Sequence, residues 1–513
     1  ASGADWPQWG GRNTRNMISD EKGLPDSFVA RPKDTGPTGG DRATATNVKW
    51  VARLGSAAYG NPTVAGGRVF VGTDDETVAE DPRFERARGG LVKCLDEATG
   101  KLLWQLVVPE RTGLPAKLLY GQQHLGICSS PTVDGDRVYV VTCAAEVLCL
   151  DVHGQANGND GPYVDEARYM VGRGKTPVEL KPTDADIVWR YDLIEDLKVC
   201  PHDVASCSVL IDGNVLYVST CNGVDKPHET VLAPQVPAFI ALDKRNGRLL
   251  ATEDEKISTR LFHCQWSSPS LGQVGDKKLV FLGGGDGFCY AFEALSEVPE
   301  KPVPLKRVWS FDCNPPEYRL RDGKPIHYMS GDKRRRNSPN KNDGLYVGPS
   351  EIIGTPVLHD GRVYVAIGQD PAHGRGRGML QCFDASKTGD ITKTGPIWSY
   401  DGLDRTIATA AVADGLVYIT DIAGRLHCLD ADNGKCYWVY DTKAETWGGV
   451  LVADGKLYFG NQKAFFIMAA GKQARLLARI PLGSAVYSTP IVANGVVYVA
   501  SQRYLWALHQ TAP

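Results

Sequence analysis

Short runs in which apolar and polar residues alternate recur along almost the whole chain. Each repeat begins with small residues and an apolar strand, followed by an Asp-Gly or Gly-Gly turn and a second strand such as RVYV. A variable loop then leads to a strand ending in Leu-Asp, a Gly-containing turn and a strand ending in Trp. Alternation rich in Val and Tyr between Gly turns is typical of antiparallel strands. Four strands per repeat, at a period of roughly 40 residues or more, predict the blades of a β-propeller.

Counting the leading strands predicts eight blades in one all-β domain covering residues 1–513. The last repeat reaches only three strands before the chain ends, and 47-NVKWVARL-54 supplies a fourth. We therefore expect this N-terminal strand to complete the last blade and close the ring, which removes an exposed sheet edge. The blades are expected to start near Tyr59, Cys128, Ser206, Trp266, Ile353, Ile407, Trp447 and Tyr487.

Two positions of the repeat predict packing. Tryptophan fills the fourth strand of six repeats, where we expect it to dock between neighbouring blades. These residues are Trp50, Trp104, Trp189, Trp309, Trp398 and Trp438. Cysteine precedes Leu-Asp or Phe-Asp in four repeats, where Ala stands in others, so these cysteines are expected to be free and to act as small apolar residues. They are Cys94, Cys149, Cys382 and Cys428.

The LDxxTGKxxW style of repeat, the GRVYV strands and the opening 5-DWPQWGG-11 resemble the pyrroloquinoline-quinone-type (PQQ-like) propellers from about Asp5 to Gln510. The resemblance implies the fold. The family includes quinoprotein alcohol dehydrogenases, an outer-membrane barrel-assembly scaffold lipoprotein and many exported proteins of unassigned role, so it does not select an activity.

Charge and composition exclude some functions. The chain has 57 basic and 60 acidic residues and a net charge of -3, which argues against a nucleic-acid partner. No apolar run reaches the roughly 18 residues of a membrane span. The chain begins ASGADW without an initiator Met, so we expect a processed protein of the periplasm or the secreted fraction. Its thirteen cysteines include no CxxC pair, which disfavours haem attachment and zinc knuckles.

Three histidines depart from the repeat. His124, His202 and His263 lie at nearly the same position before the first strands of blades two, three and four. They are expected to gather at one mouth of the central funnel and to hold a divalent metal, with Gln265 or Glu351 as a further ligand. Asp203 lies at the same level of the loops. The alternatives are that one of these histidines acts as a general base, or that each caps a loop carbonyl.

Aromatic and basic residues near the funnel are candidates for substrate binding. Tyr59, Trp266, Trp447 and Tyr487 are expected at the mouth, where they either stack on sugars or cover the blades. Insertions at 152–186 and 314–350 interrupt the repeat, and the second carries a basic run with Arg334 and Arg335. This run forms either a solvated loop or a lid that attracts an anionic substrate.

These observations lead to three hypotheses. The first is a metal-dependent enzyme acting on a small molecule or oligosaccharide, with lyase-like elimination from an acidic sugar favoured. Its catalytic candidates are His124, His202, Arg405 and Tyr487. The second is a PQQ-dependent dehydrogenase, disfavoured because the chain has no Cys-Cys pair and no convincing set of calcium ligands. The third is a non-catalytic propeller that binds protein or glycan.

Overall fold

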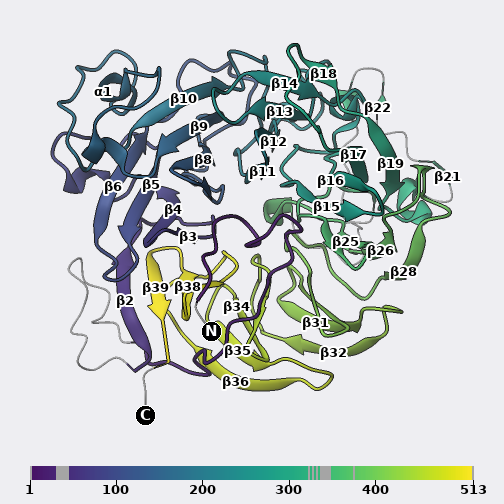
Figure 1. The fold of residues 1–513 in the computed structure, drawn as a ribbon. Helices are drawn as coiled ribbons and strands as arrows, with labels where there is room; N and C mark the ends of the chain where they lie inside the picture. Colours follow the sequence, from purple (N-terminus) through teal and green to yellow (C-terminus); the bar gives the residue numbers. More distant parts are fainter. Residues whose placement is uncertain are drawn as a thin grey trace.

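Antiparallel sheets are arranged radially around one axis (Figure 1). The computed structural model describes residues 3–30, 46–321, 324–325, 329–330, 333–334, 348–373 and 376–510. Within these ranges, eight sheets of four principal strands follow one another around the ring. The predicted eight-bladed all-β propeller is therefore confirmed. No helix in these ranges is long and apolar enough to cross a bilayer.

In each blade the first strand is innermost and the fourth outermost. Blades 1 to 4 contain β3 (Thr63–Ala65), β4 (Arg68–Asp74), β5 (Gly90–Asp96) and β6 (Leu102–Val108); β7 (Thr132–Asp134), β8 (Arg137–Val141), β9 (Glu146–Asp151) and β10 (Ile187–Asp192); β11 (Leu210–Asp212), β12 (Val215–Ser219), β13 (Phe239–Asp243) and β14 (Leu249–Thr252); and β15 (Ser270–Val274), β16 (Lys277–Gly283), β17 (Phe288–Glu293) and β19 (Arg307–Asp312).

Blades 5 to 8 repeat this plan. They contain β24 (Val357–His359), β25 (Arg362–Ala366), β26 (Leu380–Asp384) and β28 (Pro396–Tyr400); β29 (Ala411–Ala413), β30 (Leu416–Thr420), β31 (Arg425–Asp430) and β32 (Cys436–Asp441); β33 (Leu451–Ala453), β34 (Lys456–Gly460), β35 (Phe465–Ala469) and β36 (Arg475–Ile480); and β37 (Ile491–Ala493), β38 (Val496–Ala500), β39 (Tyr504–Leu508) and β2 (Val48–Arg53).

Short elements lie in the connections and at the edges of the blades. Parallel pairs extend three blades, with β1 (Ile18–Ser19) beside β33, β18 (Val303–Pro304) beside β14 and β27 (Gly389–Asp390) beside β19. The insertion between β9 and β10 carries η4 (Gly154–Asn157) and α1 (Glu166–Tyr169). The insertion between β19 and β24 carries η6 (Pro316–Arg319), β20 (Leu320–Arg321), β21 (Lys324–Pro325), β22 (Met329–Ser330) and β23 (Lys333–Arg334). The remaining turns are η3 (Val78–Glu80), η5 (Ile257–Arg260) and η7 (Pro371–His373).

The ring closes through an antiparallel pair between the two ends of the chain. In β2 and β39, Val48 lies opposite Leu508 and Arg53 opposite Tyr504. The N-terminal strand thus becomes the outer strand of blade 8, as the sequence predicted.

The fourth-strand tryptophans join each blade to the next. The indole Nε1 of Trp104 donates to the carbonyl of Val152 in blade 2 at 2.9 Å, and that of Trp189 donates to Lys244 in blade 3 at 2.9 Å. Trp50, Trp309, Trp398 and Trp438 make the same contact with the following blade. A Cβ on Gly247 would lie 2.6 Å from the Trp189 ring, so the Gly of this turn is what lets the indole lie flat on the next blade.

Small residues at the axis are required by the close approach of neighbouring blades. A Cβ on Gly354 would lie 2.5 Å from the carbonyl oxygen of Ala408 in the next blade. The following position carries a polar side chain that links blades. The amide of Ser130 donates to the hydroxyl of Ser208, whose own amide donates to Ser268, both at 2.9 Å. These bonds form a belt around the axis.

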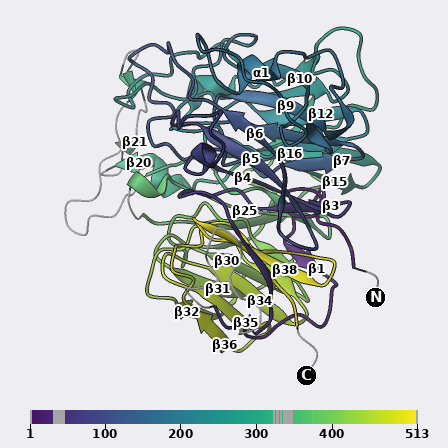
Figure 2. The ribbon, with the colours of Figure 1, turned by 90° about the vertical axis from the view of Figure 1, so that its left-hand side faces the viewer.

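The N-terminal segment, residues 5–19, crosses the middle of the ring on one face (Figures 1 and 2). The amide of Val133 donates to Pro7 at 2.7 Å, and the amide of Leu271 donates to Asn13 at 2.8 Å. Arg15 is fully buried and donates to the carbonyls of Val209 and Pro269 at 2.8 and 3.0 Å. The opposite face carries the connections that enter each inner strand, and we call it the mouth face.

The repeated cysteine position behaves as predicted. Cys94, Cys149, Cys382 and Cys428 are free and buried, and burial raises the pKa of each thiol. Their role is that of small apolar residues beneath the strands.

Candidate metal centre and axial pocket

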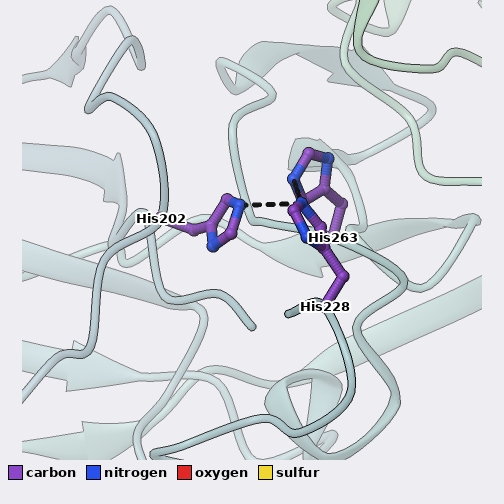
Figure 3. A group of neighbouring side chains, drawn as sticks. All are labelled: His202, His228 and His263. Atoms are coloured by element: carbon purple, nitrogen blue, oxygen red, sulfur yellow. Dashed lines mark hydrogen bonds between the residues drawn. The ribbon is translucent and has the colours of Figure 1, made fainter. Parts of the chain in front are cut away.

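Three histidine side chains meet on the mouth face (Figure 3). His202 comes from the loop between β10 and β11, and His263 from the loop between η5 and β15. His228 comes from the long connection between β12 and β13. His202 and His263 are buried and His228 is half-buried.

The Nε2 atoms of the three rings converge. His202 Nε2 lies 3.1 Å from His228 Nε2, which lies 2.9 Å from His263 Nε2. Ligand atoms bound about 2.1 Å from a common ion lie about 3.0 to 3.4 Å apart, from octahedral to tetrahedral geometry. The separation of 3.1 Å falls within that range, and the separation of 2.9 Å lies just below it.

The other nitrogen of each ring faces an oxygen. His202 Nδ1 lies 2.7 Å from the carbonyl of Val224, and His228 Nδ1 lies 3.0 Å from the carbonyl of Lys226. A carbonyl only accepts, so these two Nδ1 atoms carry the ring protons. His263 Nδ1 lies 3.8 Å from Glu351 Oε1. The Nε2 atoms of His202 and His228 are then both acceptors directed at the point where the three rings converge, an arrangement that a cation stabilises.

Two carboxylates lie beside the histidines. Asp203 Oδ2 lies 3.7 Å from His202 Nε2 and 3.6 Å from His263 Nε2. Asp203, His263 and Asp370 form a second group whose ligand atoms lie within 4.8 Å of one another. Burial, with the neighbouring Asp370 carboxylate, raises the pKa of Asp203 to about 7. The side chain of Gln123 donates to Asp203 Oδ1 at 2.5 Å.

The loop after β25 adds a fourth imidazole. His373 is exposed, and its ring centroid lies 4.7 Å from that of His263 and 5.1 Å from that of His228. It is not among the three histidines whose nitrogens converge. His373 therefore lies at the edge of the centre, open to solvent.

The structure brings together two of the three histidines singled out in the sequence, but His124 is in neither ligand group. The chain segment that carries it does pass Asp203, since the amide of Gly121 donates to the Asp203 carbonyl at 2.9 Å. There it presents Gln123 to the carboxylate, while His124 takes a left-handed φ of 52°. Its imidazole instead lines a small cavity together with Tyr120.

Gln265 and Glu351, the further ligands expected from the sequence, occupy different positions. The amide of Gln265 is engaged by the backbone, since Nε2 donates to Gly283 at 2.8 Å and Oε1 accepts from Gly285 at 2.8 Å. Glu351 lies behind His263, with Oε1 3.8 Å from Nδ1, and does not join the convergent nitrogens.

The remaining catalytic candidates lie apart from the histidines. Arg405 is fully buried, donates to the carbonyl of Gly348 at 2.5 Å and to the hydroxyl of Ser350, and lies over the ring of Tyr318. It anchors the end of the insertion before β24. Tyr487 belongs to the axial aromatic group, and burial raises its pKa. Of the basic run, the backbone of Arg334 lies in β23, and Arg335 lies outside the described residues.

The aromatic candidates gather at the axis, where they line a cavity of about 130 Å³. Tyr59, Trp447 and Tyr487 are stacked, with centroids of Trp447 and Tyr487 4.1 Å apart. Trp266 also lines the cavity, and its ring lies nearly perpendicular to that of His263, with centroids 4.7 Å apart. Trp266 therefore separates the axial pocket from the histidine centre.

His228 was not predicted from the sequence, because the predicted histidines share one position of the repeat. His228 belongs to no repeat position. The unusual length of the connection that carries His228 could have drawn attention to it. Residues 220–238 separate β12 from β13, whereas only residues 142–145 separate β8 from β9. A bridge between Val224 and Val231 folds this connection back, so that His228 turns towards His202 and His263.

Fold and repeat place the chain in the class of eight-bladed PQQ-like β-propellers. Residues 88–297, 341–440 and 390–464 match the family described as outer membrane protein assembly factor BamB. This match spans more than half of the chain, which therefore belongs to that family. No curated protein sequence matches it.

Several solved structures are similar in fold. BamB from Moraxella catarrhalis is 13% identical with a TM-score of 0.49, over 90% of this chain and 98% of that one. A quinohemoprotein alcohol dehydrogenase from Comamonas testosteroni is 15% identical with a TM-score of 0.48, over 99% and 81%. A europium-containing methanol dehydrogenase is 13% identical with a TM-score of 0.45, over 97% and 89%.

Proposed function

We propose that this propeller is a metal-dependent enzyme acting on a carbohydrate, with His202, His228 and His263 as the ligands of a divalent metal. The observation that carries the proposal is the convergence of three Nε2 atoms at 2.9 and 3.1 Å while the Nδ1 atoms of His202 and His228 face carbonyls. Neutral imidazoles in these tautomers direct their lone pairs at one point, which is favourable when a cation occupies it.

The chemistry of the donors supports a transition metal. Imidazole ligands suit zinc, copper, iron and nickel rather than magnesium or calcium. The carbonyls that face Nδ1 of His202 and His228 support the same interpretation, because metal-binding histidines commonly donate their other N–H to a carboxylate or carbonyl.

Three protein nitrogens leave a position for water or substrate, which is the arrangement of catalytic rather than structural zinc sites. A metal there would polarise a substrate oxygen or activate water. Among this chain's own residues, Asp203 lies beside two of the ligands and His373 lies at the solvent edge. Both are placed to accept or return a proton.

The carbohydrate part of the proposal is supported by the aromatic axis beside this centre, since aromatic faces stack on sugar rings. Elimination from an acidic sugar, the reaction favoured by the sequence, remains part of the proposal. Because Arg405 is buried against Ser350 and Gly348, neutralising the sugar carboxylate would fall to the metal.

Pyrroloquinoline quinone does not fit this chain. The quinone is a tricyclic molecule that carries several carboxylates, whereas the axial cavity measures about 130 Å³ and, within the described part of the chain, no charged residue lines it. The chain also lacks adjacent cysteines.

A non-catalytic protein-binding propeller is the second candidate, favoured by the family description. It gives the histidine centre no role, so metal content separates the two functions.

The test measures metal by elemental analysis in the purified full chain and in His228→Ala, with His359→Ala as control. His359 lies at the end of β24 and belongs to neither ligand group. We expect about one transition-metal ion per wild-type chain, the same content in His359→Ala, and loss of the ion in His228→Ala. Wild-type protein that takes up no metal from zinc-, copper- or nickel-containing buffer would overturn the proposal.

A further inference from the structure

His202 and His263 each have one ring nitrogen close to two different sets of neighbours. Their Nε2 atoms lie 3.1 and 2.9 Å from His228 Nε2. The same two atoms lie 3.7 and 3.6 Å from Asp203 Oδ2. Among the described residues, Asp203 is not in the ligand group that contains His228, and it forms a group with His263 and Asp370 instead. The two buried imidazoles are therefore shared between a histidine side and a carboxylate side.

Each carboxylate on the second side has one oxygen held by an N–H group. Gln123 Nε2 donates to Asp203 Oδ1 at 2.5 Å, and the amide of Ala372 donates to Asp370 Oδ1 at 2.8 Å. Asp203 is 8% exposed, and its other oxygen, Oδ2, is the one that lies near the two imidazoles. The contact with Gln123 therefore fixes which oxygen Asp203 presents to them.

Two neighbouring carboxylates in a largely buried place repel each other. Burial and the Asp370 carboxylate together raise the pKa of Asp203 to about 7, which expresses the cost of charging both groups. A divalent cation removes this repulsion, and carboxylate oxygens are ligands that suit Mn²⁺. Three imidazoles, in contrast, suit zinc, copper and nickel. The two sides of the centre therefore favour different ions.

The two sides cannot be filled independently. A neutral imidazole has one nitrogen lone pair that is free to bind a cation. His263 belongs to both ligand groups, and its Nε2 is the atom that lies near both His228 and Asp203. An ion on one side therefore uses the lone pair that an ion on the other side would need.

We propose that the centre offers two overlapping metal positions that select ions of different class. The histidine position consists of His202, His228 and His263 and takes zinc, copper or nickel. The carboxylate position consists of Asp203, Asp370 and His263 and takes the harder ion Mn²⁺. This inference rests on the proposed metal centre and adds a second ion to it. An ion in the carboxylate position binds Asp203, which is free for proton transfer only while the ion occupies the histidine position.

The first experiment titrates Mn²⁺ and, separately, Zn²⁺ into the full chain stripped of metal with a chelator. Loss of the electron paramagnetic resonance signal of free Mn²⁺ measures Mn²⁺ binding, and competition with a chromophoric chelator measures Zn²⁺ binding. Asp370→Asn should weaken Mn²⁺ binding by at least about 10-fold, since even the loss of a partner behind a metal ligand commonly costs that much. Its effect on Zn²⁺ should be far smaller. His228→Ala should show the reverse pattern.

Asp254→Asn, at an exposed position outside both ligand groups, is the control and should leave both affinities unchanged. Thermal unfolding of each variant verifies that it is folded. A wild-type chain that binds no Mn²⁺, or equal sensitivity of the two metals to Asp370→Asn, would overturn the carboxylate position even where zinc binds as proposed. A chain that binds no Zn²⁺ would count against the histidine position and so against the proposed function, which makes the two failures distinguishable.

The second experiment tests the overlap of the two positions. Zn²⁺ is first added at one equivalent per chain, and Mn²⁺ is then titrated into the same sample. Because both ions need His263 Nε2, bound Zn²⁺ should exclude Mn²⁺, and the signal of free Mn²⁺ should stay at its full strength. Binding of both ions together, each with the affinity that it shows alone, would refute the shared ligand.

Discussion

The rings of Trp266 and His263 pack against each other with centroids 4.7 Å apart and planes at 79°, while the same indole lines the axial pocket. Its Nε1 donates to the carbonyl of Val204 at 2.8 Å, which holds the ring between the two sites. A ligand in the pocket and an ion among the histidines would therefore contact one shared side chain.

The carboxylate behind His263 should control how tightly the centre holds its metal. Glu351 Oε1 lies 3.8 Å from His263 Nδ1, and replacing such an outer partner commonly costs about 10- to 100-fold in metal affinity. We therefore expect Glu351→Gln to weaken metal binding by about that factor, measured in competition with a chromophoric chelator.

Glu317→Gln is the control, because Glu317 is exposed in η6 and should leave affinity unchanged. Unaltered affinity in Glu351→Gln would show that this carboxylate does not orient His263.

The N-terminal segment should stabilise the ring through one buried cation. Replacing Arg15 by Ala leaves the carbonyls of Val209 and Pro269 without its donors, and we expect a loss of about 3 kcal/mol in the free energy of unfolding. Urea unfolding measures it. Arg12→Ala in the same segment removes an exposed side chain and should change stability by less than about 0.5 kcal/mol. Equal effects of the two substitutions would contradict the role given to Arg15.

A buried carboxylate in blade 2 should make stability depend on pH. Burial raises the pKa of Asp186 to about 7, whereas an unfolded Asp titrates near about 3.9. The folded chain then binds more protons between these values, so the contribution of Asp186 to stability falls as pH rises from about 4 to 7 and stays level above that.

Asp186→Asn abolishes this dependence and keeps an acceptor for the amide of Asp160, which now donates to Oδ2 at 2.8 Å. We expect the variant to gain about 1 to 2 kcal/mol over wild type at pH 8 and no gain at pH 4. Asp254→Asn, at an exposed position, should show no such difference. The same gain at both pH values would argue against a titrating Asp186.

The repeat predicted the fold well because each recurring residue makes a contact that every blade requires. Trp189 donates to the carbonyl of Lys244 in the next blade. Its ring also packs against Gly247, where a Cβ would clash with it. Gly354 is small because the next blade passes within reach of its Cβ. Such requirements recur with the blade and are visible without a structure.

The candidate metal centre was only partly predictable, because its histidines do not belong to the residues that recur in every blade. His202 and His263 precede the first strands of their blades, where most repeats have no histidine, and their side chains do meet. His124 occupies the same position in the sequence, yet the neighbouring Gln123 takes the contact with Asp203. His228 and His373 come from irregular connections, whose course no periodicity reveals.

The pairing of β2 with β39 has a consequence for synthesis. Val48 emerges from the ribosome long before Leu508, its partner in the finished sheet, so an early strand stays unmatched until nearly the whole chain has been translated. Contacts between such distant residues form slowly, and a waiting strand is open to wrong pairing. The two ends cannot pair until β39 has been made, and a nascent chain stalled before β39 would leave β2 without its partner strand.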